Sequence, residues 1–182
     1  MRLGVMCSGN GSNFENIVRT CRHDEVVIMV YNKKECGAKE RAEKLGIPHV
    51  RIKSCSEEEM ITLFKAWRVD LIVLAGWMKI VSPTLINAFP NKIINIHPSL
   101  LPKHKGLHVV QKALDAGDIV AGCTVHYVTE ELDSGDIIKQ GEVPILSDDT
   151  VETLTKRIQQ KEYCILPIAI KDVKQRLQTT SY

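Results

Sequence analysis

The stretch LGVMCSGNGSNFENIV, residues 3–18, decides the fold class of this chain. Its first five residues, Leu3–Cys7, form an apolar run that predicts a buried strand. Ser12 and Glu15 have the spacing of a capping box, and apolar side chains then recur at helical spacing, so Ser12 is expected to cap a helix. A strand joined to a helix by a glycine-containing turn is the unit from which parallel α/β sheets are built.

The same alternation of apolar runs and amphipathic stretches continues along most of the chain. Further strands are expected over four apolar runs, Val26–Tyr31, His49–Ile52, Leu71–Ala75 and Ile93–Ile96. Helices are expected over Gly37–Leu45, from Ser56 with a capping box at Glu59, from Ser82 with Pro83 at the first helical position, and over Val109–Ala116.

The rhythm changes towards the C-terminus. Two strands, Gly122–Val128 and Ile137–Val143, are separated by a short polar turn and are expected to be antiparallel. A long helix from Thr150 should turn Val151, Leu154 and Ile158 inward, and Pro167 should kink or break it. The sequence therefore predicts an α/β fold: a Rossmann-like, open, mostly parallel twisted sheet with helices on both faces and an antiparallel C-terminal strand pair, in a single domain over residues 1–182.

Composition excludes several classes of protein. The 182 residues carry a net charge of only +2, with acids and bases interspersed, which gives no electrostatic case for nucleic acid or a membrane surface. The six cysteines are scattered without a C-x-x-C pair, a pattern that suits a reducing compartment. No signal-peptide or bilayer-spanning run is present, so a cytoplasmic location is expected.

The loop Ser8–Asn13 is the first place where chemistry is expected. Its two glycines let the backbone approach a ligand, and a helix N-terminus presents free N–H groups to an anion. Glycine also serves any tight strand-to-helix turn, so a purely structural loop stays open as an alternative. Phe14 stands where a dinucleotide fingerprint has its third glycine, and Tyr31-Asn32 lacks the acid that holds a ribose. A sugar phosphate therefore fits better than NAD or ATP.

The second place is the end of the strand before Pro98. Strand alternation puts Asn95 and His97 on one side, where an amide donor and a titratable imidazole address the same ligand atom. Such a pair suits attack of an amine on a carbonyl, because the amide stabilises the oxyanion while the imidazole moves a proton. The alternative is a buried histidine whose ring is satisfied by the backbone.

The third place is Thr124-Val125-His126 with the acidic turn that ends at Asp133. In the functional interpretation Asp133 faces His97 and favours its protonated form, while Thr124 and His126 share a strand face and line the same pocket. In the structural interpretation, Asp before a small residue and glycine is ordinary turn chemistry, and His126 is packed or solvated.

Six segments, in this order, carry a family resemblance: SGNGSN at 8–13, LAGWMKIVSP at 74–83, NIHPSLLP at 95–102, KGLH at 105–108, GCTVHYVTEELDSG at 122–135 and RIQQKE at 157–162. Together they resemble the phosphoribosylglycinamide formyltransferase family, folate-dependent enzymes of purine synthesis. NIHPSLLP with the downstream H-x(6)-D marks the wider formyltransferase superfamily. The SGNGSN loop and Gly106-Leu107-His108 point to the glycinamide ribonucleotide branch.

The resemblance implies transfer of a formyl group from 10-formyltetrahydrofolate to the amine of glycinamide ribonucleotide in de novo purine (IMP) synthesis, without a metal, by a monomer or homodimer. Asn95, His97 and Asp133 match the catalytic positions. Substrate-binding positions are matched by Gly11, Ser12, Asn13, Gln159 and Glu162. Folate-side positions are matched by Trp77, Met78, Lys79, Ile80 and Val81, by Val128, Thr129, Glu130, Glu131, Leu132 and Asp133, and by Asn95.

The sequence departs from the family pattern at three places. Lys79 stands where arginine is common, Asp136 where the family often has a neutral residue, and the helix around Ser56–Arg68 is shortened, which puts contacts to the folate tail in doubt. The tight loop and the resemblance also suggest a cis Leu101-Pro102 bond. Three alternatives remain open: a formyltransferase for another amine, a formyltetrahydrofolate hydrolase, and a non-catalytic sugar-phosphate-binding module.

Overall fold

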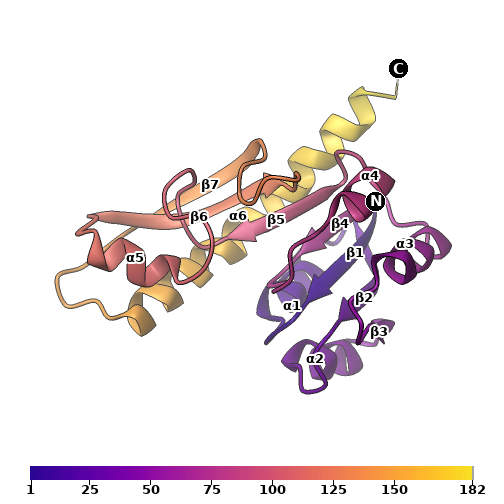
Figure 1. Ribbon diagram of the computed structural model, residues 1–182, viewed down its shortest axis with the longest axis horizontal. Coiled ribbons are helices and arrows are strands. Elements are labelled where there is room, and N and C mark those ends of the chain that lie inside the picture. Colours follow the sequence, from indigo (N-terminus) through magenta and orange to yellow (C-terminus); the bar gives the residue numbers. More distant parts are fainter. Residues whose placement is uncertain (182) are drawn as a thin grey trace. The chain divides into compact units, whose positions relative to one another are not determined.

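The computed structural model describes residues 1–181, which form two compact units, one from Met1 to Asn95 and the other from Ile96 onwards. The strands hydrogen-bond in the order β3-β2-β1-β4-β5-β6-β7 (Figure 1). Neighbours among β1 to β5 pair in parallel, whereas β6 and β7 pair antiparallel. The expected α/β fold, with a mostly parallel sheet and an antiparallel C-terminal pair, is confirmed. The single domain over 1–182 stays a prediction.

The first unit holds five strands and four helices. Its strands are β1 (Arg2–Cys7), β2 (Glu25–Tyr31), β3 (His49–Arg51), β4 (Leu71–Leu74) and the greater part of β5 (Ile93–His97). Its helices are α1 (Ser12–Thr20), α2 (Gly37–Leu45), α3 (Glu57–Ala66) and α4 (Pro83–Ala88). Val5 on β1 pairs with Met29 on one side and Val73 on the other, and all three side chains are fully buried. Strands buried on both faces read as continuous apolar runs, which is why these were recognisable.

The second unit contains α5 (Val109–Asp115), β6 (Val120–Tyr127), β7 (Ile137–Pro144) and α6 (Val151–Thr179). Helix α6 runs along β6 and β7 and covers one face of this strand pair (Figure 1). Leu154, Ile158 and Leu166 are buried on that side of the helix. Thr150 caps the helix, and its side chain and that of Thr153 bond reciprocally to the other residue's backbone N–H.

Two local predictions are wrong, and a third is wrong in part. Ser12 is the first helical residue and does not cap α1; the N-cap is Gly11, in the left-handed conformation (φ 76°) and without a side-chain cap. Val151 is 40% exposed because it lies in the first turn of α6, ahead of the buried positions. Pro167 does not break α6, which continues to Thr179, while a kink at this residue stays a prediction. Buried positions on both sides of the proline hold the helix together there, namely Ile165, Leu166, Ala169, Ile170 and Val173.

Other local predictions are confirmed. Ser56 caps α3 by accepting a hydrogen bond from the Glu59 N–H, Ser82 caps α4 with Pro83 at its start, and the Leu101-Pro102 bond is cis. Within residues 1–181, no helix is both long enough and apolar enough to cross a membrane.

Candidate active site

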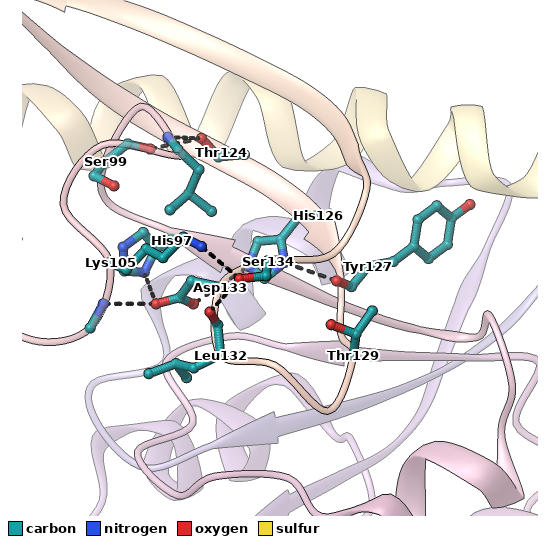
Figure 2. A network of polar contacts seen from close by, with 12 residues as sticks. His97, Ser99, Lys105, Thr124, His126, Tyr127, Thr129, Leu132, Asp133 and Ser134 are labelled. Carbon is teal, nitrogen blue, oxygen red and sulfur yellow. Dashed lines mark hydrogen bonds and ion pairs between the residues drawn. The ribbon is translucent and has the colours of Figure 1, made fainter.

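Asp133 lies between two histidines in the second unit. Its Oδ2 is 3.7 Å from His97 Nδ1, and its Oδ1 is 3.7 Å from His126 Nε2 (Figure 2). All three residues are buried, with 8% or less of each exposed. Three titratable side chains therefore lie together in a buried cluster.

The remaining ring nitrogen of His97 fixes its tautomer. His97 Nε2 is 2.9 Å from the carbonyl oxygen of His104. A carbonyl oxygen only accepts hydrogen bonds, so Nε2 must carry a hydrogen and donate it. In the neutral ring Nδ1 is then the nitrogen with the free electron pair, and it is the one that faces Asp133. The proton-accepting atom of His97 is therefore Nδ1.

The backbone around Asp133 fixes the direction of its carboxylate. Asp133 has a left-handed conformation (φ 51°), and its Oδ2 accepts a hydrogen bond of 2.9 Å from the Gly106 N–H. Non-glycine residues adopt this conformation at a cost of about 1–2 kcal/mol, and such residues collect at functional sites. Gly135 allows the turn to close, because a Cβ there would collide with the Tyr127 carbonyl.

Asn95 and His97 lie two residues apart near the end of β5, as the sequence predicts. Asn95 is half-buried, while Ile94 and Ile96 beside it are buried in the sheet. Strand alternation therefore directs the Asn95 amide and the His97 ring to the same face.

Thr124 holds the loop that follows β5. Its hydroxyl donates to the Ser99 carbonyl at 2.7 Å and accepts from the Leu101 N–H at 3.1 Å. Gln140 on β7 completes this contact by donating to the Leu101 carbonyl at 2.8 Å. The Thr124 side chain is fully buried, and its hydroxyl is engaged by the backbone and by Gln140. A role for Thr124 in lining the substrate pocket stays a prediction.

His126 is neutral at neutral pH. Burial lowers its pKa, while the Tyr127 carbonyl and Asp133 act in the opposite direction and the nearby His97 again lowers it. Its Nδ1 lies 2.9 Å from the Tyr127 carbonyl and therefore carries the hydrogen. His126 Nε2 is left with an electron pair directed at Asp133, so this ring can take a proton from the cluster.

The lowered pKa of His126 predicts a dependence of stability on pH. Below the ordinary value of 6.5 the unfolded chain binds a proton at this residue before the folded chain does, so folding stability falls as the pH drops below 6.5. Replacing His126 with asparagine should remove its share of that loss between pH 7.5 and 5.5, which has a ceiling of about 1.4 kcal/mol for one group. Urea denaturation of both proteins at both pH values measures the difference; equal losses would contradict the assignment.

The anion loop lies in the first unit, between β1 and α1. Gly11 takes its left-handed conformation against helix α2, where an added Cβ would stand 2.6 Å from the Cα of Ala38. The Arg41 Nε donates to the Asn10 carbonyl at 2.8 Å, and its guanidinium pairs with Glu15. Contacts with α2 therefore hold the loop, and Ser12 and Asn13 supply the first backbone N–H groups of α1.

The first-unit residues that match folate-binding positions, 77–81, are mostly exposed, and one hydrogen bond ties their segment to the anion loop. Met78 and Ile80 are 57% and 77% exposed, whereas Val81 is buried. The Met78 N–H donates to Ser8 Oγ at 2.9 Å, which ties this segment to the anion loop. Trp77 is half-buried and Lys79 exposed. Apolar side chains held open to solvent in this way suit a flat aromatic ligand.

The predicted site residues of the second unit fall into two groups. Thr129, Glu130, Glu131 and Leu132 are exposed in the turn between β6 and β7, next to the half-buried Val128 and the buried Asp133. On α6, Gln159 is exposed but Glu162 is buried, at 7% exposure. Among residues 1–181, no group of three or more His, Cys, Asp or Glu side chains is placed so that it could hold a metal ion.

Sequence reasoning missed residues that hold the site together. His104 binds His97 through its carbonyl, Gly106 binds Asp133 through its N–H, and Arg41 holds the anion loop. Contacts made by backbone groups leave no pattern of side-chain types in the sequence from which they could be predicted. The glycine at 106, with φ 83°, is the one signal that a special backbone conformation was needed there.

Comparisons with known proteins place the chain in a family. The phosphoribosylglycinamide formyltransferase of Escherichia coli (strain K12) is 39% identical over 181 residues, which cover 93% of this chain and 85% of that protein. The trifunctional purine biosynthetic protein adenosine-3 of Drosophila melanogaster is 41% identical over 93% of this chain. This chain spans only 14% of the length of that fly protein.

Solved structures extend the likeness to the fold. The crystal structure of phosphoribosylglycinamide formyltransferase from Anaplasma phagocytophilum superposes with a TM-score of 0.91 at 40% identity, over 94% of this chain and 85% of that one. The family model described as formyl transferase matches residues 1–170. The family model matches most of this chain, and the bacterial relative aligns over most of both sequences. This chain therefore belongs to the formyl transferase family.

Proposed function

We propose that this chain is an enzyme that transfers the formyl group of 10-formyltetrahydrofolate to the amine of glycinamide ribonucleotide, a step of de novo purine synthesis. The observation that carries the proposal is the buried pair of His97 and Asp133 beside Asn95 in a member of the formyl transferase family. The names of its bacterial relatives support glycinamide ribonucleotide as the acceptor.

The proposed reaction begins when the neutral amine attacks the formyl carbon. Negative charge then develops on the formyl oxygen, where the Asn95 amide and protonated His97 stabilise it. A C–N bond forms to the substrate amine and the C–N bond to the folate nitrogen breaks. Protonated His97 gives its Nδ1 proton to the leaving folate nitrogen and then takes up the proton lost by the amine, directly or through a water molecule, so that Asp133 again faces an imidazolium.

Binding is assigned to two groups of residues. The N–H groups of Gly11, Ser12 and Asn13 bind the substrate phosphate, since the loop is anchored from behind by Ala38 and Arg41. Gln159 and Glu162 contact the ribose and glycinamide. The pterin of the folate lies against Trp77, Met78, Lys79, Ile80 and Val81 and against the turn from Val128 to Asp133. The enzyme acts in the cytoplasm as a monomer or homodimer.

One assay tests the proposal. Purified protein is mixed with glycinamide ribonucleotide and 10-formyltetrahydrofolate, and release of tetrahydrofolate is followed by absorbance. The expected result is transfer that requires the amine. Release of formate without an amine would instead identify a hydrolase, transfer only to a different amine would change the acceptor, and binding of the ribonucleotide without turnover would leave a sugar-phosphate-binding module.

A further inference from the structure

We propose that His104 and Asp118 form a positioning pair that sets the ring of His97, a role that rests on the proposed function for its effect on turnover. Neither residue is expected to touch a substrate. They act through the backbone carbonyl of His104, which is the hydrogen-bond acceptor of His97 Nε2 at 2.9 Å. Whatever fixes that carbonyl fixes the tautomer and the direction of the His97 ring.

The backbone at His104 is held in an uncommon conformation. His104 is left-handed, with φ 54°, a state that disfavours residues with a Cβ. The Ser99 hydroxyl lies 2.7 Å from the Lys103 carbonyl and 3.0 Å from the His104 carbonyl, so it supports the same turn from inside. This conformation turns the His104 carbonyl towards His97 and needs an external contact to offset its cost.

The external contact is Asp118. His104 Nε2 lies 2.7 Å from Asp118 Oδ2, and the two side chains are only 19% and 13% exposed. The hydrogen bond from His104 is the largest cause of the lowered pKa of the Asp118 carboxyl, which therefore stays ionised at neutral pH. Asp118 itself is anchored directly after α5, where its N–H donates to the Ala113 carbonyl at 3.2 Å.

These contacts form one continuous path from a rigid element to the proton-accepting atom. Helix α5 holds Asp118, Asp118 holds the His104 ring, the His104 carbonyl holds His97 Nε2, and His97 Nδ1 faces Asp133. The same loop also reaches Asp133 directly through the Gly106 N–H. Loss of the His104–Asp118 contact therefore loosens both partners of the His97–Asp133 pair.

The test is a double-mutant cycle on the full chain with H104A, D118A and the double variant. Each single variant is expected to lower kcat about tenfold while both KM values change less than twofold, because a small misplacement of a catalytic group affects chemistry more than binding. The double variant should lose no more than either single one, as residues acting through one contact are not additive. H104Q should recover most of the activity, since its amide nitrogen replaces Nε2 as the donor.

The matched control is K103A. Lys103 Nζ also pairs with Asp118, at 3.3 Å, but its side chain is 65% exposed and it makes no side-chain contact with His97. This variant should keep wild-type kcat. Melting temperatures of all variants show whether each is folded under the assay conditions.

A second readout does not depend on turnover. The ring ¹⁵N shifts of His97, identified by their absence in H97A, should report hydrogen on Nε2 in the wild type and a mixture of tautomers in D118A. An unchanged His97 tautomer in a folded D118A protein would overturn the proposal, as would full additivity in the cycle. If the wild type transfers no formyl group, the proposed function fails, while the ¹⁵N measurement still decides the positioning role.

Discussion

Replacing His97 with alanine is expected to lower kcat for formyl transfer between about 10²- and 10⁴-fold, the range for loss of a general acid–base group. The reason is the geometry of its two nitrogens. Nε2 is bound to the His104 carbonyl, and Nδ1 faces the buried Asp133 carboxylate, so alanine removes the imidazole that β5 places beside Asp133. Steady-state rates with glycinamide ribonucleotide and 10-formyltetrahydrofolate measure the loss.

A measurement of substrate binding distinguishes a catalytic role of His97 from a structural one. The dissociation constant of glycinamide ribonucleotide, measured by calorimetry, should change less than about threefold in H97A, because the phosphate is assigned to the loop at Gly11, Ser12 and Asn13. The matched control is H23A, which removes an exposed histidine and should keep normal turnover. A kcat for H97A within threefold of the wild type would remove His97 from the mechanism.

Asp133 is tested together with His97. D133N keeps the size of the side chain and the hydrogen bond from Gly106 but removes the charge that stabilises the imidazolium. It should lower kcat by a similar order of magnitude, and the H97A/D133N double variant should lose little beyond H97A alone, since the two side chains act as one unit. If the loss of kcat in the double variant equals the product of the two single losses, the two side chains act separately.

The sequence predicted the sheet well because of how its strands are buried. Strands such as β2, which are buried on both faces, appear in the sequence as unbroken apolar runs. Both ends of helix α2, Gly37 and Leu45, were also predicted correctly. Turns and helix caps were harder to predict from the sequence. Ser12 and Glu15 have capping-box spacing, yet Gly11 is the N-cap, because packing against Ala38 selects the left-handed conformation there. That packing depends on a helix far along the chain.

The candidate site was predictable where its residues share an element. Asn95 and His97 lie on one strand, so strand periodicity alone gives their common face. The proximity of Asp133 came only from the family resemblance, because its turn follows a different strand and no pattern links the two. His104 and Asp118 belong to no motif, and their contact appears only when the loop after β5 folds back towards α5.

The anion loop makes the second large prediction, for Gly11→Ala. The new Cβ would stand 2.6 Å from both the Cα and the Cβ of Ala38, and the residue would keep a φ of 76°. Left-handed strain of about 1–2 kcal/mol and overpacking of about 1–3 kcal/mol together give a loss of about 2–5 kcal/mol in the free energy of unfolding. The loop must also move away from α2, so KM for glycinamide ribonucleotide should rise at least about tenfold, roughly the 1.4 kcal/mol of a single anion contact.

Gly46→Ala separates the two causes, because Gly46 ends α2 with a similar φ of 68° but has no atom within 4 Å of an added Cβ. This variant carries the left-handed strain alone and should lose only about 1–2 kcal/mol, with KM for both substrates unchanged. Urea denaturation and steady-state kinetics on the two variants give the comparison. If G11A is no less stable than G46A and binds the ribonucleotide normally, close packing of the loop on Ala38 does not shape the anion site. The expected result is a larger loss of unfolding free energy in G11A than in G46A, weaker binding of the phosphorylated substrate and an unchanged KM for the folate. This combination ties the Gly11–Ala38 contact to phosphate recognition.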